Sequence, residues 1–153
     1  MNRKIILAVF ISSVISSCGG GGGGDDFTPK SFAGVWAGDM YTTSNTCSFI
    51  TWSAGRVIHN VNQNGNRIVL DIPSGATTYE GTLDGADGFT VGQEVVNQPV
   101  GNGVSCRLTV AMRYTAADKD AALVDNVQRY ECSSGSGKSS CGFKAYGELY
   151  RQK

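Results

Sequence analysis

The residue types that most often carry catalysis are sparse in this sequence. His59 is the only histidine, so a Ser-His-Asp arrangement would have to use it, and a metal site with several histidine ligands is impossible. His59 lies in a stretch of alternating apolar and polar residues, and no nucleophile motif lies nearby. We therefore predict that His59 is an ordinary strand residue.

Carboxylate pairs are the second chemistry to consider, because two carboxyl groups can hydrolyse a glycosidic bond. Four glutamates lie in alternating segments at positions expected to face solvent: Glu80, Glu94, Glu131 and Glu148. Asp84 and Asp87 resemble part of a calcium-binding loop, but two carboxylates among small residues fit a hairpin turn better. The sequence therefore predicts neither an enzyme nor a metal site, and it implies no cofactor.

The first 17 residues have the pattern of a secretory signal, in which Arg3 and Lys4 precede the apolar run 5–11. This run is shorter than the roughly 20 residues that a membrane-spanning helix needs, which disfavours the alternative of an uncleaved anchor helix. The segment 15–18, Ile-Ser-Ser-Cys, resembles the lipobox of bacterial lipoprotein precursors. The resemblance implies that Cys18 receives diacylglycerol and that the chain is cut just before it.

A glycine-rich tether follows the cysteine, since residues 19–24 are all glycine. Such a tether lets a lipid-anchored domain clear the headgroups. The chain thus divides into a signal peptide (1–17), a lipidated Cys18 with its tether (18–30) and one domain (31–153). Position 19 is Gly; by resemblance to enterobacterial sorting, where Asp there favours the inner membrane, we expect an outer-membrane anchor outside the cytoplasm.

The four remaining cysteines are an even number in a chain sent out of the cytoplasm, which predicts two disulfides. A four-thiolate zinc site is the alternative, but the sequence has no Cys-x₂-Cys pair. Cys132 and Cys141 flank a Ser/Gly-rich segment, 133–140, which favours pairing them and leaves Cys47 with Cys106. The nested alternative joins Cys106 to Cys132 and Cys47 to Cys141.

The body of the domain predicts strands. From residue 32 onward, short alternating stretches are separated by Gly, Asn, Asp and Ser, with no convincing amphipathic helix. Asn64-Gly65 is the strongest hairpin signal, and the residues 104–115 alternate most clearly, with period two. The expected strands are 35–42, 49–52 leading into 56–63, 67–72, 77–83, 89–96, 104–115, 124–132 and 142–151.

About eight strands with short turns predict a single all-β domain, in which sequential neighbours pair as antiparallel hairpins. We favour a closed up-and-down barrel, because closure removes exposed sheet edges, and keep a β-sandwich as the alternative. In such a barrel the four cysteines of the domain lie at one rim. Trp36 and Arg151 lie at the other rim, on the first and last strands.

The clearest alternation also predicts a register. If 104–115 and 124–132 form a hairpin centred on Lys119, opposed residues have numbers that sum to twice 119, or 238. A slip by one residue would turn every apolar side chain outward. The predicted pairs are Leu108 with Tyr130 and Cys106 with Cys132 on the buried face, and Arg107 with Glu131 and Arg113 with Asp125 on the wet face.

The two ends of the domain resemble those of lipocalins and related barrels. Gly34-Val35-Trp36 opens the first strand, and Arg151 closes the last. In that family the Trp packs across the barrel floor under a basic side chain, a contact worth about 0.5–2 kcal/mol. A barrel that binds a small hydrophobic ligand is therefore one hypothesis, with these lining candidates: Trp52, Tyr79, Met112 and Tyr130.

The charge balance excludes one class of partner. The sequence has 13 basic and 13 acidic residues, and removal of residues 1–17 leaves 11 basic, a net charge of −2. Without a basic stripe, binding to nucleic acid is not expected. We expect a lipid-anchored envelope protein with a structural or interaction role. Its partners are the membrane and either an envelope protein or a small apolar ligand.

Overall fold

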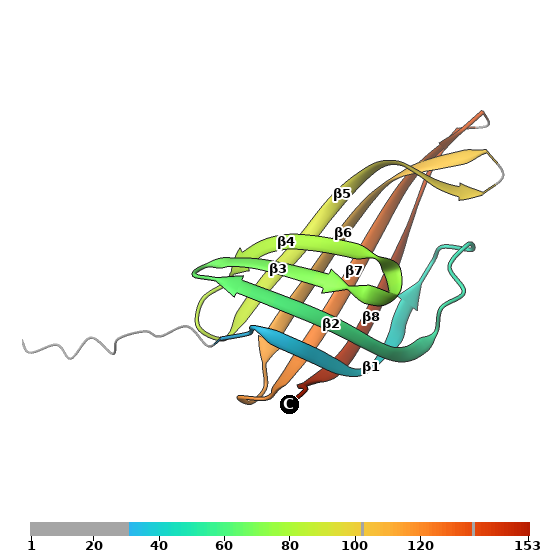
Figure 1. The fold of residues 1–153 in the computed structure, drawn as a ribbon. Helices are drawn as coiled ribbons and strands as arrows, with labels where there is room; N and C mark the ends of the chain where they lie inside the picture. Colours follow the sequence, from blue (N-terminus) through green and yellow to red (C-terminus); the bar gives the residue numbers. More distant parts are fainter. Residues whose placement is uncertain (1–30, 102, 136) are drawn as a thin grey trace, which may run out of the picture.

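The chain folds as one closed β-barrel. The computed structural model describes residues 31–101, 103–135 and 137–153. Eight antiparallel strands follow one another around the barrel in sequence order, and β1 pairs with β8 to close it (Figure 1). The predicted all-β up-and-down barrel is confirmed, and the sandwich alternative is wrong. The predicted segments 1–17 and 18–30, with Cys18, lie outside the described residues.

The strands keep close to the predicted ranges. They are β1 (Gly34–Asn45), β2 (Ala54–Asn64), β3 (Arg67–Ile72), β4 (Thr77–Leu83), β5 (Gly88–Gly101), β6 (Val104–Ala116), β7 (Ala121–Ser134) and β8 (Gly137–Arg151). A 3₁₀ turn, η1 (Pro73–Gly75), connects β3 to β4.

Two predicted boundaries are wrong. Residues 49–52 belong to the loop between β1 and β2, not to a strand. Within the segment 133–140, predicted to be a loop, residues 133–134 and 137–140 instead belong to the β7–β8 ladder, with Ser134 opposite Gly137. Ser and Gly have low intrinsic preference for strands, but a long neighbouring strand supplies backbone hydrogen bonds whatever the side chain.

Period-two alternation fills the barrel interior. One continuous apolar cluster receives side chains from every strand and from the residues just before β1. Its most buried large members, each at most 1% exposed, are Phe32, Trp36, Ile68, Leu70, Phe89, Met112, Tyr114 and Leu149. A second, smaller cluster surrounds Cys106 and Cys132 at one end. The interior is therefore occupied by packed side chains along most of its length.

The predicted register of β6 and β7 is confirmed: Leu108 is opposite Tyr130, and Arg107 is opposite Glu131. Arg113 is likewise opposite Asp125, but neither of the two predicted charge pairs forms an ion pair among the described residues. Arg107 pairs with Glu94 on β5 at 3.4 Å, and Glu131 pairs with Arg129 on its own strand at 3.3 Å. The register is therefore set by the inward apolar side chains, because exposed ion pairs contribute little.

Glycines allow neighbouring strands to approach closely where the barrel wall bends. A Cβ atom placed on Gly81 of β4 would lie 1.9 Å from the carbonyl oxygen of Thr90 on β5. A Cβ atom on Gly147 of β8 would lie 2.4 Å from the carbonyl oxygen of Asp39 on β1. Only residues without a side chain fit at these two places.

The two ends of the barrel differ. At the N-terminal rim lie Ser31, the short turns 65–66, 84–87 and 117–120, and the end of β8. At the disulfide rim lie the loop 46–53, η1 and the tips of two hairpins. The β5–β6 and β7–β8 hairpins extend well beyond the shorter strands β2 to β4 at this rim (Figure 1). The chain thus enters the barrel at one end and its longest hairpins project from the other.

Candidate functional site

The barrel floor is sealed by the two residues that the sequence singled out. Trp36 is 1% exposed, and its indole Nε1 donates a hydrogen bond of 2.7 Å to the carbonyl oxygen of Phe32. The guanidinium carbon of Arg151 lies 4.8 Å from the centroid of the Trp36 ring. Trp36 and Arg151 are direct neighbours where β1 and β8 close the barrel. This is the cation–π arrangement that the two ends of the domain led us to expect.

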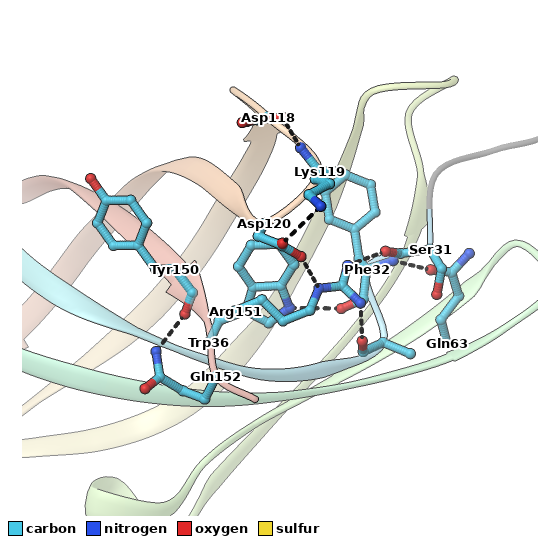
Figure 2. Close-up of polar contacts among 11 residues, drawn as sticks. Ser31, Phe32, Trp36, Gln63, Asp118, Lys119, Asp120, Tyr150, Arg151 and Gln152 are labelled. Atoms are coloured by element: carbon cyan, nitrogen blue, oxygen red, sulfur yellow. Dashed lines mark hydrogen bonds and ion pairs between the residues drawn. The ribbon is translucent and has the colours of Figure 1, made fainter.

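Arg151 also fixes the segment that precedes β1 (Figure 2). Its guanidinium donates to the carbonyl oxygens of Ser31 and Ala33, and its Nε lies 3.7 Å from a carboxylate oxygen of Asp120. Phe32 then packs edge-on against Phe89, with ring centroids 5.0 Å apart. Residues 31–33 are therefore a plug held against the barrel floor by main-chain and charged contacts.

His59 points into the barrel and is 2% exposed. A hydrogen bond joins its Nδ1 to the hydroxyl of Tyr114, whose ring stacks on Phe89 at 4.3 Å. Trp36 is its neighbour across β1 and β2. Burial lowers the pKa of His59 from 6.5 to about 4, and burial raises the pKa of Tyr114. Burial therefore favours the neutral forms of His59 and Tyr114, and aromatic side chains surround them. A catalytic histidine is instead held between a carboxylate and a nucleophile.

All four cysteines of the domain form disulfides at the disulfide rim, but the favoured pairing is wrong. The bonds join Cys47 to Cys141 and Cys106 to Cys132, which is the nested alternative. Because β7 and β8 continue to their hairpin tip, Cys132 lies opposite Ser139 and is out of register with Cys141. Cys106, by contrast, lies directly opposite Cys132.

The Cys47–Cys141 disulfide ties the loop 46–53 to β8, and two aromatic side chains of this loop contact the barrel. The ring of Phe49 meets Tyr130 edge-on at 5.1 Å, and the ring of Trp52 meets Phe143 at 5.8 Å. Hydrogen bonds also hold the loop: Nδ2 of Asn45 donates one of 2.7 Å to the carbonyl oxygen of Ile50. It therefore forms a fixed cover over the β7–β8 side of the rim.

The proposed lining residues are divided between two places. Tyr79 and Tyr130, each 8% exposed, lie close enough to influence one another: burial and then Tyr130 raise the pKa of Tyr79. Trp52 is 38% exposed on the covering loop. Met112 is 1% exposed and lies deeper, within the main core. Tyr79 and Met112 both belong to the main core cluster, whereas Tyr130 belongs to the smaller cluster around Cys106 and Cys132.

Three polar side chains lie inside the barrel between the two apolar clusters: Gln93, Asn126 and Gln128. We call this polar level of the interior the mouth. All three are half-buried on the inward side of their strands. The Tyr130 hydroxyl donates a 2.9 Å hydrogen bond to Oε1 of Gln128. The Oδ1 atom of Asn126 is buried and has no hydrogen-bond partner among the described residues. An orphaned carbonyl of this kind is costly unless a water or ligand satisfies it.

Four clefts formed by the described residues open to the surface. The first, of about 750 Å³, runs along the extended ends of β5 to β8 and is lined mainly by polar residues such as Asn97, Arg107 and Lys138. A second, of about 460 Å³, lies on the outer wall around β1. Smaller clefts of about 350 and 200 Å³ lie beside Phe143 and beside Arg67. None of these four is lined by Trp52, Tyr79, Met112 or Tyr130.

The acidic side chains lie on the outer surface, as the alternation predicts. Glu80, Glu94, Glu131 and Glu148 are all exposed, and Glu80 forms a 2.9 Å ion pair with Arg67. Asp84 stands in the β4–β5 turn, where its carboxylate accepts a hydrogen bond from the Thr90 hydroxyl. The hairpin turn predicted at Asp84 to Asp87 is therefore present between β4 and β5.

Sequence reasoning missed two core partners. Phe32 precedes Trp36 by four residues and was not assigned to the core, because it lies before the alternating pattern begins. Tyr114 lies in the alternating stretch 104–115, but nothing in that pattern indicates a contact with His59 across the barrel. Proximity across a barrel is not encoded in local spacing.

Comparisons with protein-family models, curated proteins and solved structures find no match to this chain. Among the described residues, no helix has the length and apolar character that crossing a membrane requires.

Proposed function

We propose that this protein is a lipid-anchored barrel of the bacterial cell envelope, attached through Cys18 and acting through contacts on its surface rather than by catalysis. The observation that carries this proposal is the filled interior: one cluster of packed side chains occupies the barrel from the floor upward. A barrel of this kind offers its outside to partners. The signal, the lipobox resemblance and the glycine tether supply the anchor.

The position of the N-terminal segment supports an orientation. Ser31 is held at the N-terminal rim by Arg151, and Cys18 precedes it by 13 residues. A Gly-rich coil of that length reaches about 20 Å. We therefore expect the N-terminal rim to face the outer membrane, with the disulfide rim and its two long hairpins pointing away from it.

The disulfides support an extracytoplasmic location. Two bonds among four cysteines are typical of an oxidising compartment and unusual in the cytosol. The surroundings of His59 support the absence of catalysis, since its hydrogen-bond partner is a buried tyrosine. Outer-membrane anchoring, rather than inner-membrane anchoring, follows from Gly at position 19.

A second candidate function, binding of a small apolar ligand, is favoured by the mouth. Asn126 offers an unpaired carbonyl oxygen there, beside the inward side chains of β6 and β8. A ligand would have to enter under the loop 46–53. Native mass spectrometry of the protein isolated from its own envelope tests this function. A small molecule that stays bound to the lipidated chain would support it. The mass of the lipidated chain without any bound molecule would count against it.

The anchor is tested by labelling. We expect the wild-type protein to incorporate labelled palmitate and to sediment with membranes. Cys18→Ser should lose the label and accumulate as the uncleaved precursor, whereas the matched variant Ser16→Ala, which keeps the cysteine, should behave as wild type. Equal labelling of the Cys18→Ser and wild-type proteins would end the lipoprotein proposal.

A further inference from the structure

Exposed apolar side chains gather on one outer face of the barrel. Five of the nine large apolar side chains that the described residues expose lie on β1 and its two neighbours, β2 and β8. We call this face the β1 wall and define it by Val35, Tyr41, Ile58, Tyr146 and Tyr150, which are 39–56% exposed. Exposed apolar side chains gathered on one face mark an interaction site more often than isolated exposed residues do.

The strand register arranges the wall in rows. Ala37 of β1 lies between Ile58 of β2 and Tyr150 of β8, and Tyr41 lies opposite Tyr146. Ala37 has the small side chain at this point and is covered by its neighbours, being 4% exposed. The 460 Å³ cleft follows the same strands, and Tyr41 and Tyr150 both line it. The wall is thus a shallow hollow with a tyrosine on each side.

A charged row crosses the wall between the apolar rows. Asp39 lies opposite Arg56 on one side and opposite Glu148 on the other. All three side chains are exposed, and none forms a salt bridge with another described residue. Two carboxylates directly opposed across a strand pair, as Asp39 and Glu148 are, are unfavourable. From β2 to β8 the row therefore carries one positive charge, on Arg56, and then two negative charges, on Asp39 and Glu148.

We propose that the β1 wall is the interface of a homodimer, with a second copy of this chain as its occupant. A twofold interface must be complementary to itself, so a patch that carries both signs of charge suits it better than a patch with one sign. A twofold axis along β1 sets β2 of one copy against β8 of the other. Arg56 then faces Glu148 of the partner subunit, in both directions. At the level of Ala37, Ile58 of β2 faces the partner's Tyr150, and Tyr41 on the axis meets its own copy.

The same axis keeps the N-terminal rims of both copies at one end, because a rotation about β1 does not reverse the direction along it. Both tethers then reach the same membrane. This step rests on the proposed lipid anchor. Three strands spaced by about 4.8 Å and seven residues rising about 3.3 Å each give a flat area of roughly 330 Å² per copy. That is small for an interface, but copies confined to a membrane meet at a raised effective concentration.

Photocrosslinking of the full chain in the membranes of expressing cells tests the proposal. Tyr41→p-benzoylphenylalanine should give a product of twice the monomer mass, made of this chain alone. The matched control Thr82→p-benzoylphenylalanine, on the outer face of β4, should not. A product containing only a different protein, or no product, would overturn the homodimer.

Charge exchange makes the test specific. Arg56→Glu in the Tyr41→p-benzoylphenylalanine background should lower the dimer yield by at least about tenfold, because like charges opposed in an interface are strongly unfavourable. The double variant Arg56→Glu, Glu148→Arg should regain most of it, and Asp39→Asn should raise the yield, since Asp39 meets its own copy at the axis. A double variant that stays as low as the single one would refute the proposed axis.

Palmitate labelling of the same samples separates the two proposals. Labelled protein without a dimer would overturn the homodimer and leave the anchor standing. Unlabelled protein that still gives the dimer would overturn the anchor and leave the interface standing. Loss of both would count against both.

Discussion

Because His59 is buried against Tyr114, the barrel should lose stability as the pH falls through the mildly acidic range. His59 is neutral in the folded protein, where burial lowers its pKa from 6.5 to about 4. The unfolded chain binds the proton more readily, so the stabilising contribution is complete above the unfolded pKa of 6.5 and is lost as pH falls towards about 4. Protonation inside the core is unfavourable because the imidazolium would lack a charged partner.

The magnitude follows from the shift. A lowering of 6.5 − 4, at about 1.36 kcal/mol for each pH unit, gives a loss of about 3 kcal/mol once the pH is below both values. Between about pH 7.5 and pH 5 the loss is about 2 kcal/mol, because only the unfolded state takes up most of a proton in that range. This is a large part of the stability of a small domain.

Urea unfolding followed by tryptophan fluorescence measures this, at several pH values, for the wild-type protein and His59→Gln. Gln can still hydrogen-bond to the Tyr114 hydroxyl but does not titrate. We expect the free energy of unfolding of the wild-type protein to fall by about 2 kcal/mol more than that of the variant between about pH 7.5 and pH 5. Parallel pH profiles for the two proteins would show that the folded and unfolded pKa values of His59 are alike, and the reasoning would be wrong.

Three further predictions concern the packing of the barrel, and each is read from urea unfolding of the purified variants. Gly81→Ala should destabilise the fold by about 1–3 kcal/mol, because a Cβ atom would collide with a backbone carbonyl oxygen, whereas Gly135→Ala, with open space around it, should be nearly neutral. Arg151→Gln should cost about 0.5–2 kcal/mol through the lost cation–π contact and should speed hydrogen exchange in residues 31–36; unchanged exchange would mean that the guanidinium does not hold the plug. Cys47→Ser should destabilise more than Cys106→Ser, by about 4.7 against about 3.5 kcal/mol, because the first bond closes a sequence separation of 94 and the second one of 26; the reverse order would show that loop entropy does not dominate.

Much of the fold could be predicted because strand alternation is a local property. The pattern over 104–115 gave both the strand and its register, since the inward positions must all be apolar at once. The two ends of the domain indicated closure, because Trp36 and Arg151 had to share a rim. The predicted position of Cys106 opposite Cys132 is confirmed as well. That register already implied the Cys106–Cys132 disulfide, although the Ser/Gly-rich segment 133–140 led us to favour Cys132 with Cys141.

What could not be predicted depends on three-dimensional proximity or on weak propensities. The side chains of the segment 133–140 indicate a loop, yet β7 and β8 remain paired as far as Ser134 and Gly137. In this longer hairpin Cys132 lies opposite Ser139 and not opposite Cys141. The contact between His59 and Tyr114 crosses the barrel, so no spacing rule reaches it. The β1 wall could have been suspected: Tyr41, Tyr146 and Tyr150 occupy outward positions of alternating strands, where polar residues are expected.

Intact-mass spectrometry of the protein extracted from envelope membranes tests the proposed lipid anchor on Cys18. We expect a mature chain that begins at Cys18, lacks residues 1–17 and carries the mass of a diacylglyceryl group on that cysteine. The membrane-extracted protein should also retain two disulfides. A chain that keeps residues 1–17, or one that is cleaved elsewhere and carries no acyl mass, would show that Cys18 is not a lipid anchor.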